Sequence, residues 1–303
     1  MATTKEWLEG ARPKTLPAAF VPVAVGTATA AFVGTPLSAL SFWFRAVLAL
    51  VVSLALQVGV NYANDYSDGI RGTDNVRVGP VRLVGQGLAE PSAVKKVAWA
   101  SFGVAAVAGL LLTLLTQAWW LLIIGVIAIL AAWFYTGGPS PYGYAGVGEV
   151  SVFIFFGVVA VTGTTFVLTN SLNLLAFLFS IPIGLFACSL LVVNNLRDIP
   201  GDTEAGKRTL AVRLGDQRTR ALYTFCVLVP FLIVGVLGLC GVGNVPFLPA
   251  GALLALVALP MATIPLRRVR RGDTGPDLVK VLVGTARIQL AFGLLLTLGV
   301  ALS

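Results

Sequence analysis

The chain has 303 residues, of which 57% are hydrophobic and only 11% charged, and its 21 basic and 13 acidic side chains give a net charge of +8. A soluble domain carries roughly 25% charged residues, so this composition excludes a water-soluble fold and indicates an integral membrane protein. The basic excess does not indicate nucleic-acid binding, because membrane topology and anionic lipid headgroups account for cations that gather in alternate loops.

Long apolar runs recur along the whole chain, separated by charged or Gly/Pro-rich stretches. A transmembrane helix needs about 20 mostly apolar residues. Nine segments fit this requirement: residues 15–33, 41–64, 93–116, 118–136, 147–169, 174–196, 217–242, 248–266 and 278–301. The runs are continuous and lack the two-residue alternation of a membrane barrel. We therefore expect an all-α bundle of nine transmembrane helices that forms one membrane domain over residues 1–303.

The first segment has an alternative interpretation as a targeting peptide, since Arg12 and Lys14 precede its apolar residues. It contains Pro17 and Pro22 and is long for a signal peptide. We therefore expect it to be a retained first span.

The distribution of cations predicts the orientation. Lysine and arginine concentrate in cytoplasmic loops. Here they precede the first span and fill the loops after the second, sixth and eighth, whereas the loops near 34–40, 117, 170–173 and 243–247 carry no charge. We expect a multi-pass protein of the cytoplasmic membrane with its amino terminus inside and its carboxy terminus outside. Arg287, about two turns into the last span, either snorkels along its helix or belongs to an anion site.

Six acidic residues lie in two short stretches at the cytoplasmic ends of the second and sixth spans, "NDYSDGIRGTD" (64–74) and "NNLRDIPGDTEAGKRT" (194–209). Both stretches carry polar residues at helical intervals of three or four, which places them on one helix face. These residues are Gln57, Asn61, Asn64 or Asp65, and Asp68 in the first, and Asn194, Asp198 and Asp202 in the second. A polar face near the end of a membrane helix requires a polar partner or a water-filled cavity. We expect the two faces to converge.

Two converging carboxylate faces repel one another unless a cation lies between them. Carboxylate and amide oxygens are preferred ligands of Mg²⁺, whose coordination substrate phosphates usually complete. The neighbouring basic residues would donate to those phosphates; they are Arg71, Arg77, Arg82, Lys207 and Arg208. The sequence thus predicts a magnesium-dependent diphosphate site at the membrane surface. The alternative is a pair of solvated loops held by salt bridges.

The two motifs end spans that lie four spans apart in the chain. This spacing is expected if the first eight helices form two four-helix units related by internal pseudosymmetry, with a ninth helix added. Because the two halves share little sequence identity, the test of this hypothesis is how the helices of the two units are arranged in space.

The two acidic motifs resemble the two aspartate-rich motifs of the UbiA superfamily of intramembrane prenyltransferases. Four more stretches, "ARPKTLPAAFVPVAVGTA", "GPVRLVGQGL", "FYTGGPSPYGYAGVGE" and "RTLAVRLG", are similar to its 1,4-dihydroxy-2-naphthoate polyprenyltransferase branch. The resemblance covers essentially the whole chain. It implies a UbiA-type bundle and Mg²⁺-dependent transfer of a chain from polyprenyl diphosphate to 1,4-dihydroxy-2-naphthoate, with decarboxylation, giving demethylmenaquinol in menaquinone biosynthesis.

The resemblance also implies roles for the motif residues. Magnesium and diphosphate would be bound by Asn64, Asp68, Asp198 and Asp202. Deprotonation would require Asp65, Asp198 or the released diphosphate, because the chain has no histidine. The chain departs from the superfamily pattern at Gly72, where a third acid is common, with Asp74 two residues later. The loop before the fifth span also lacks the lysine found in other branches.

The prenyl chain and the aromatic acceptor need further contacts. Aromatic faces can stabilise an allylic cation, and the acceptor carboxylate needs a cationic or amide anchor. Candidates for these roles are Arg12, Lys14, Asn61, Tyr62, Tyr66, Tyr135, Tyr144, Glu149, Asn194, Asn195 and Arg287.

Three alternative functions remain open at this point. An ion-coupled transporter also carries intramembrane acids, although its site tends to lie near the midplane. A non-catalytic scaffold of the quinone pathway is a second alternative. The third is a UbiA-type enzyme with another acceptor, such as 4-hydroxybenzoate. The length of the prenyl chain and the oligomeric state are also open.

Overall fold

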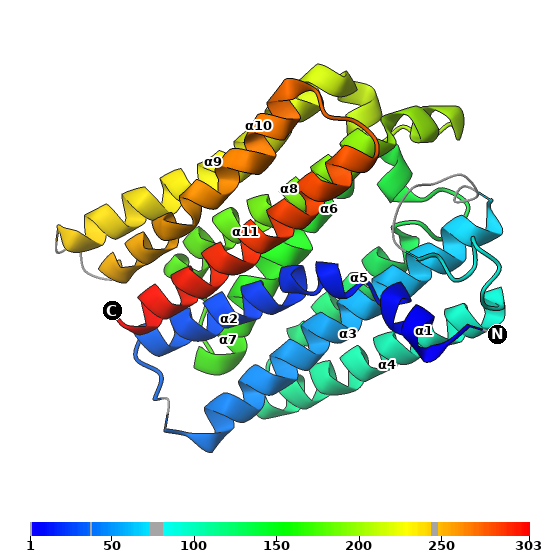
Figure 1. Ribbon diagram of the computed structural model, residues 1–303. Coiled ribbons are helices and arrows are strands. Elements are labelled where there is room, and N and C mark those ends of the chain that lie inside the picture. The colour runs from blue at the N-terminus through cyan, green and yellow to red at the C-terminus, as the bar shows by residue number, and fades with distance from the viewer. Residues whose placement is uncertain (1, 37, 73–80, 244–247) are drawn as a thin grey trace.

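The computed structural model describes residues 2–36, 38–72, 81–243 and 248–303, and every regular element within these ranges is a helix. Figure 1 shows most of the helices lying roughly side by side in an elongated bundle, with the two termini at opposite ends. The expected all-α class is confirmed.

The helices follow the expected spans in chain order. The long elements are α2 (Pro17–Phe32), α3 (Leu40–Ile70), α4 (Pro91–Thr116), α5 (Trp120–Phe134), the continuous run of α6 (Gly148–Val152), η3 (Phe153–Val159) and α7 (Ala160–Thr169), α8 (Leu174–Glu204), α9 (Leu210–Val242), η4 (Ala250–Ala262) joined to α10 (Thr263–Arg271), and α11 (Pro276–Ala301). The short elements are α1 (Thr4–Gly10), η1 (Pro13–Thr15) and η2 (Tyr142–Ala145).

The number of spans differs from the sequence prediction. Within the described residues, 7 helices are long and apolar enough to cross a membrane, and up to 8 if the pair Thr4–Thr15 and Pro17–Phe32, bent by 50°, is one broken span. Helix α5 has only 15 residues; at about 1.5 Å per residue it is shorter than the roughly 30 Å hydrocarbon core. The structure confirms a multi-pass helical protein, but not the count of nine.

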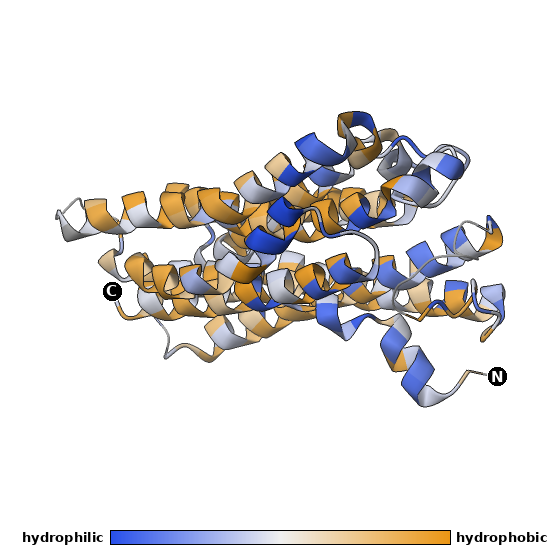
Figure 2. Cartoon of the chain, turned by 45° about the horizontal axis from the view of Figure 1, so that its top comes forward, coloured by the Kyte–Doolittle hydropathy of each residue, from blue (hydrophilic) through white to orange (hydrophobic). Residues whose placement is uncertain are grey.

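Helices α3 and α8 are longer than their apolar runs. Each has 31 residues, which at about 1.5 Å per residue exceeds the thickness of the hydrocarbon core. The apolar runs end near residues 64 and 196, but the helices continue to Ile70 and Glu204. Both acidic motifs therefore begin on helical turns, at the end of the bundle where Figure 2 shows hydrophilic residues gathered.

The packing follows the expected pseudosymmetry. Helix α3 packs along α4, and its counterpart α8 packs along α9. Helices α2 and α7 pack against each other, and each also contacts the other unit's long helix, α2 on α8 and α7 on α3. Helix α11 packs on α2, α8 and η4 as an additional element. This reciprocal arrangement is the one that two related four-helix units predict.

Close helix crossings hold the two units together. A Cβ atom on Gly26 of α2 would lie 2.7 Å from the carbonyl oxygen of Val161 on α7, so only glycine permits this approach. Next to it, the Thr165 hydroxyl donates to the Gly26 carbonyl at 2.9 Å. Small residues and interhelical hydrogen bonds are common where membrane helices cross closely. This contact fixes α2 against α7 at the centre of the bundle.

An aromatic group fixes α8, which carries the second motif. The rings of Phe186, Phe231 and Phe292, from α8, α9 and α11, have centroids 4.8 to 5.7 Å apart. All three side chains are buried. Offset and edge-to-face pairs of this kind stabilise a core by more than their buried area alone, so α8 is held from two sides.

Candidate active site

The buried part of the α3 polar stripe, deeper in the bundle than the acidic residues, binds the amino-terminal segment. The Asn61 amide group donates to the carbonyl oxygen of Ala11 at 2.9 Å and to the Thr15 hydroxyl at 3.1 Å. The Gln57 amide group donates to the same hydroxyl at 3.0 Å. These bonds attach the α1–η1 connection to α3, so Asn61 has a structural partner.

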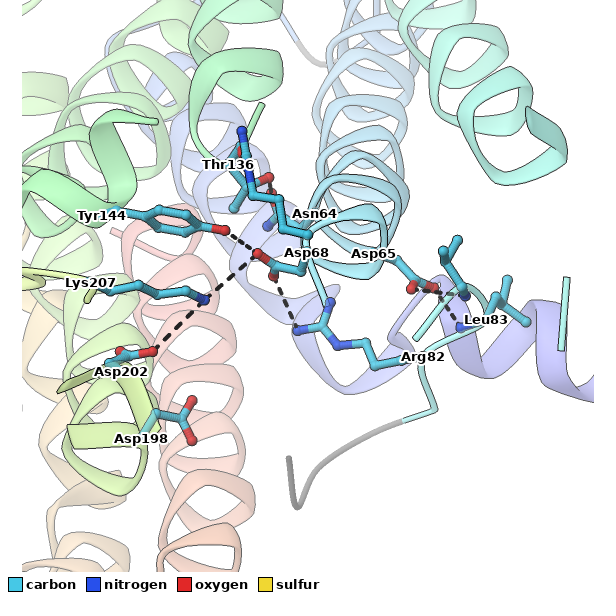
Figure 3. A network of polar contacts seen from close by, with 12 residues as sticks. Asn64, Asp65, Asp68, Arg82, Leu83, Thr136, Tyr144, Asp198, Asp202 and Lys207 are labelled. Atoms are coloured by element: carbon cyan, nitrogen blue, oxygen red, sulfur yellow. Dashed lines mark hydrogen bonds and ion pairs between the residues drawn. The ribbon is translucent and has the colours of Figure 1, made fainter. Parts of the chain in front are cut away.

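The two acidic motifs meet at one point, which we call the polar cluster: Asp68, Arg82, Tyr144, Asp202 and Lys207 (Figure 3). The Lys207 Nζ atom lies 3.8 Å from Oδ1 of both Asp68 and Asp202. Arg82 Nη2 lies 3.9 Å from Asp68 Oδ2, and the Tyr144 hydroxyl donates to Asp68 Oδ1. Asp68 is 3% exposed, and Asp202 and Lys207 are each 8% exposed. The predicted convergence of the two helix faces is therefore present.

The loop between α5 and α6 carries Tyr144, and we call it the Tyr144 loop. It is hydrogen-bonded to the second acidic motif. The backbone N–H of Arg208 donates to the Tyr144 carbonyl oxygen at 2.9 Å, and the Lys207 ammonium lies 4.4 Å from the Tyr144 ring centroid. Burial, and next the negative charge of Asp68, hold the pKa of the Tyr144 hydroxyl well above its usual range, so the phenol stays protonated and donates. The loop lacks a lysine of its own, and Lys207 supplies a cation beside its tyrosine.

Asn64 and Arg71 connect α3 to the loop that follows α5. The Thr136 hydroxyl donates to Asn64 Oδ1 at 2.7 Å. The Arg71 guanidinium donates to the carbonyl oxygens of Thr136 and Gly138 and lies 5.7 Å from the Tyr144 ring centroid. Arg71, which the sequence predicts to bind phosphate, thus has backbone partners. The sequence does not predict this contact, because every residue type carries a backbone carbonyl oxygen.

Asp198 lies one turn before Asp202 on α8 (Figure 3). Arg197 donates to its two carboxylate oxygens, Nε to Oδ1 at 2.7 Å and Nη2 to Oδ2 at 2.9 Å. Adjacent residues do not face each other on a helix, so spacing alone does not predict this pair. Arg197 is a residue of the site region that the sequence interpretation missed.

Asp65 does not join the polar cluster. Its carboxylate, 1% exposed, accepts the backbone N–H groups of Leu83 at 2.8 Å and Val84 at 3.2 Å. Figure 3 shows it directed away from Asp68. Since Arg82 precedes Leu83, Asp65 holds in place the loop that brings Arg82 to the cluster. The structure thus gives Asp65 a positioning contact rather than a place beside the other acids.

Replacing Asp65 with asparagine should loosen this loop. Hydrogen bonds to a charged group contribute about 1.5–3 kcal/mol each, so we expect the free energy of unfolding to fall by roughly 2 kcal/mol. Amide exchange of residues 81–89 should accelerate. The KM for a diphosphate substrate, which the sequence predicts Arg82 to bind, should rise several-fold. Asp216→Asn is the matched control, because the Asp216 side chain pairs with Arg220 and is 58% exposed. Unchanged exchange in the 81–89 segment would contradict the assignment.

A second polar group lies on α8 and the start of α6. The Asn195 amide group donates to Glu149 Oε1 at 3.0 Å, and Glu149 is 8% exposed. Glu149 Oε2 is buried without a hydrogen-bond partner among the described residues. The Tyr135 hydroxyl oxygen lies 3.0 Å from the position of a Cβ on Gly148, so this ring packs directly beside the residue that precedes Glu149. Since Asn195 precedes Asp202 by about two turns of α8, this group lies deeper in the bundle than the cluster.

The other candidates lie outside both groups. The Tyr62 hydroxyl donates to the Trp7 carbonyl oxygen at 2.6 Å, and Tyr66 stacks on Trp133. Five further candidates have half-buried or exposed side chains: Arg12 and Lys14 after α1, Asn194 on α8, Arg208 after α8, and Arg287 on α11. Arg77 and Asp74 lie outside the described residues.

The donor set of the cluster is compatible with Mg²⁺. Within the described ranges, no three His, Cys, Asp or Glu side chains are grouped to hold a metal ion by themselves. The carboxylates of Asp68 and Asp202 nevertheless flank one cation, the Lys207 ammonium, which marks a position where positive charge is favoured. Magnesium commonly takes one or two carboxylates and completes its coordination with water and substrate phosphate. The residues therefore fit a magnesium ion that arrives with a diphosphate.

Comparison with known proteins identifies the family. The model of the UbiA prenyltransferase family matches residues 19–275. The chain belongs to the UbiA prenyltransferase family. The transporter and scaffold alternatives are therefore set aside in favour of an enzyme.

Several UbiA-family proteins are similar to the chain over nearly its whole length. A Mycobacterium tuberculosis protein named 1,4-dihydroxy-2-naphthoate octaprenyltransferase is 48% identical, covering 97% of this chain and 96% of that protein. The Escherichia coli protein of the same name is 36% identical, covering 100% and 97%.

Solved structures show the same fold. A UbiA homolog from Archaeoglobus fulgidus bound to GPP and Mg²⁺ has a TM-score of 0.68 at 14% identity, covering 98% of this chain and 100% of that one. The apo homolog from Aeropyrum pernix K1 has a TM-score of 0.69 at 15% identity, covering 95% and 98%. The expected UbiA-type bundle is confirmed.

Proposed function

We propose that the chain transfers a polyisoprenyl group from its diphosphate to 1,4-dihydroxy-2-naphthoate in menaquinone biosynthesis. A carbon–carbon bond forms to the aromatic ring, diphosphate leaves the prenyl chain, carbon dioxide leaves the ring, and demethylmenaquinol results. The observation that carries the proposal is the meeting of two acidic helix ends with buried cations in the polar cluster. The 48% identity to a protein named for this reaction supports the choice of acceptor.

The diphosphate would bind at the polar cluster. Lys207 and Arg82 provide buried cationic donors beside Asp68, and charge-assisted hydrogen bonds to phosphate are among the strongest in proteins. Stabilising the leaving group is the main requirement for opening an allylic diphosphate. Arg208 and Arg77 are further phosphate donors in this proposal, while Arg71 acts mainly by holding the Tyr144 loop.

Four side chains would hold the magnesium ion: Asn64, Asp68, Asp198 and Asp202. When bound, Mg²⁺ supplies Lewis-acid neutralisation of the diphosphate oxygens. Tyr144 and Lys207 hold Asp68 in position, and Arg197 does the same for Asp198. The surrounding bundle excludes water, which would otherwise capture an allylic cation.

We assign the aromatic acceptor to the group formed by Glu149, Asn195 and Tyr135. Glu149 Oε2 is a buried acceptor whose partner is not supplied by the described residues. Oε2 therefore needs a hydrogen-bond donor, and a phenolic hydroxyl of the aromatic acceptor supplies one. Since Asn195 fixes Oε1, Oε2 is held in place to receive that hydroxyl.

Glu149→Gln should impair use of the acceptor without weakening binding of the prenyl diphosphate. Losing a hydrogen bond to a charged group corresponds to about 1.5–3 kcal/mol, so we expect kcat/KM for the naphthoate to fall about 10- to 100-fold. Steady-state kinetics with each substrate varied in turn measures this difference. Glu90→Gln, at an exposed position, is the control. Equal losses for both substrates would contradict the assignment.

The polar cluster faces the cytoplasm in this proposal, with the amino terminus inside and the protein in the cytoplasmic membrane. The arginines and lysines of the loops at that end support this orientation through the positive-inside rule. Labelling of single cysteines at the two termini in intact cells tests it.

Acceptor competition tests the proposed reaction. Purified protein in lipid receives a prenyl diphosphate, Mg²⁺ and equal concentrations of 1,4-dihydroxy-2-naphthoate and 4-hydroxybenzoate, and mass spectrometry identifies the product. We expect the prenylated naphthoquinol alone. A prenylated hydroxybenzoate as the main product would retain the site and overturn the choice of acceptor.

A further inference from the structure

A groove of about 550 Å³ lies between α10 and the first half of α11. Three cations, Arg268, Lys280 and Arg287, contribute to its lining, and the rest is mostly apolar. Met261 and Ile264 at this groove are 43% and 66% exposed, so the groove opens on an apolar outer face. None of the lining residues belongs to the polar cluster or to the Glu149 group, and the proposed reaction does not use the groove.

Arg287 is the unusual residue of this groove. It is the twelfth residue of α11, within a helix that qualifies as a membrane span, and it is exposed. Among the described residues, it has no hydrogen-bond or ion-pair partner. An arginine on the lipid-facing side of a span is expensive unless it reaches an anion or the interface. Helical side chains lean toward the amino-terminal end, which directs Arg287 toward Lys280, two turns earlier on the same face.

The two helices that line the groove approach each other closely near these cations. Gly284 lies one turn before Arg287, and a Cβ there would lie 2.9 Å from Pro265 Cγ on α10. The two helices therefore touch at Gly284 and Pro265, and no side chain from position 284 fills the space beneath Arg287. The groove therefore combines this apolar helix contact with the cation Arg287, one turn further along α11.

The local charge favours one anion. Arg268 lies 3.3 Å from Asp273 and 3.7 Å from Asp277, and Lys280 lies 2.9 Å from Asp277. The two acids offset two of the three cations, and Arg287 remains as a net positive charge beside apolar surface. A ligand with a single negative headgroup and a hydrocarbon chain matches this arrangement.

We propose that the groove binds an anionic phospholipid. Arg287 contacts the headgroup phosphate, Lys280 and Arg268 lie at the polar rim, and an acyl chain packs on Met261, Ile264 and Val283. The bilayer that surrounds the helices supplies this ligand, and basic side chains near a membrane surface attract anionic lipids. A soluble phosphate would not use the apolar lining.

Lipid binding tests the proposal independently of enzyme activity. Delipidated protein in detergent is titrated with phosphatidylglycerol or phosphatidylcholine, and bound lipid is counted by native mass spectrometry. The wild type should bind phosphatidylglycerol with about tenfold higher affinity than phosphatidylcholine, which corresponds to one charge-assisted hydrogen bond. Arg287→Gln should remove this preference. Arg267→Gln, an equal charge change at an exposed α10 position outside the groove lining, should retain it.

Three results would overturn the proposal. The first is a wild type without a preference for phosphatidylglycerol, and the second is an equal loss in the Arg287 and Arg267 variants. The third is displacement of the lipid by millimolar glycerol phosphate, which would indicate a site for soluble phosphate esters. Failure of the acceptor-competition assay would leave these outcomes unaffected.

Discussion

Replacing Asp68 with asparagine is expected to lower kcat/KM for the prenyl diphosphate by about 10³-fold, the upper range for loss of one preorganised electrostatic contact. Asp68 is the residue on which Tyr144, Lys207 and Arg82 converge. Asparagine has the same size and still accepts a hydrogen bond, so the fold should persist. It lacks the negative charge that pairs with the cations and that we propose to bind magnesium. Steady-state kinetics at several Mg²⁺ concentrations measures the effect.

The matched control for Asp68→Asn is Asp216→Asn, whose carboxylate pairs with Arg220 and is 58% exposed. The control should retain nearly normal turnover. Near-normal turnover of the Asp68 variant at limiting Mg²⁺ would show that Asp68 is not part of the metal and diphosphate site.

Lys207→Met should destabilise the protein in the absence of magnesium. The ammonium lies between the buried carboxylates of Asp68 and Asp202, and removal of one partner from a buried ion pair costs about 3–5 kcal/mol. We expect a loss of roughly 3 kcal/mol, because Arg82 and Tyr144 still contact Asp68. Added Mg²⁺ should restore part of the stability by binding between the same carboxylates. Turnover should fall about 100-fold, since the variant lacks the donor that we propose for the phosphate.

Denaturation in detergent, with EDTA or with Mg²⁺, tests the Lys207 prediction. Lys96→Met removes an exposed lysine of α4 and should leave stability unchanged in both conditions. If Lys207→Met is as stable as the wild type in EDTA, the two carboxylates do not depend on the ammonium. That result would remove the argument for a cation position between them.

The sequence predicts the features that follow from periodicity and polarity. Apolar runs located the helices, and helical spacing placed Asp68 and Asp202 on polar faces that had to find partners inside the bundle. Charge repulsion between these faces required a cation, and Lys207 lies there. These predictions rest on local geometry and on the high cost of unpaired charge in a membrane. They do not require the conformation of the loops to be known.

Features that depend on tertiary contacts with the backbone were not predictable. Asp65 shares a stripe with Asp68 but turns to the N–H groups of Leu83 and Val84, and Arg71 turns to carbonyl oxygens. Any residue type offers such groups, so composition carries no signal for them. The predicted count of nine spans is not confirmed, because α5 is apolar enough but only 15 residues long.

A product assay with and without the metal tests the proposed prenyl transfer most directly. Purified protein in lipid is given 1,4-dihydroxy-2-naphthoate and geranylgeranyl diphosphate, with Mg²⁺ or with EDTA, and products are identified by mass spectrometry. We expect a prenylated, decarboxylated naphthoquinol that forms with Mg²⁺ and disappears with EDTA. Equal product formation in EDTA, or no prenylated product with any aromatic acceptor, would contradict it.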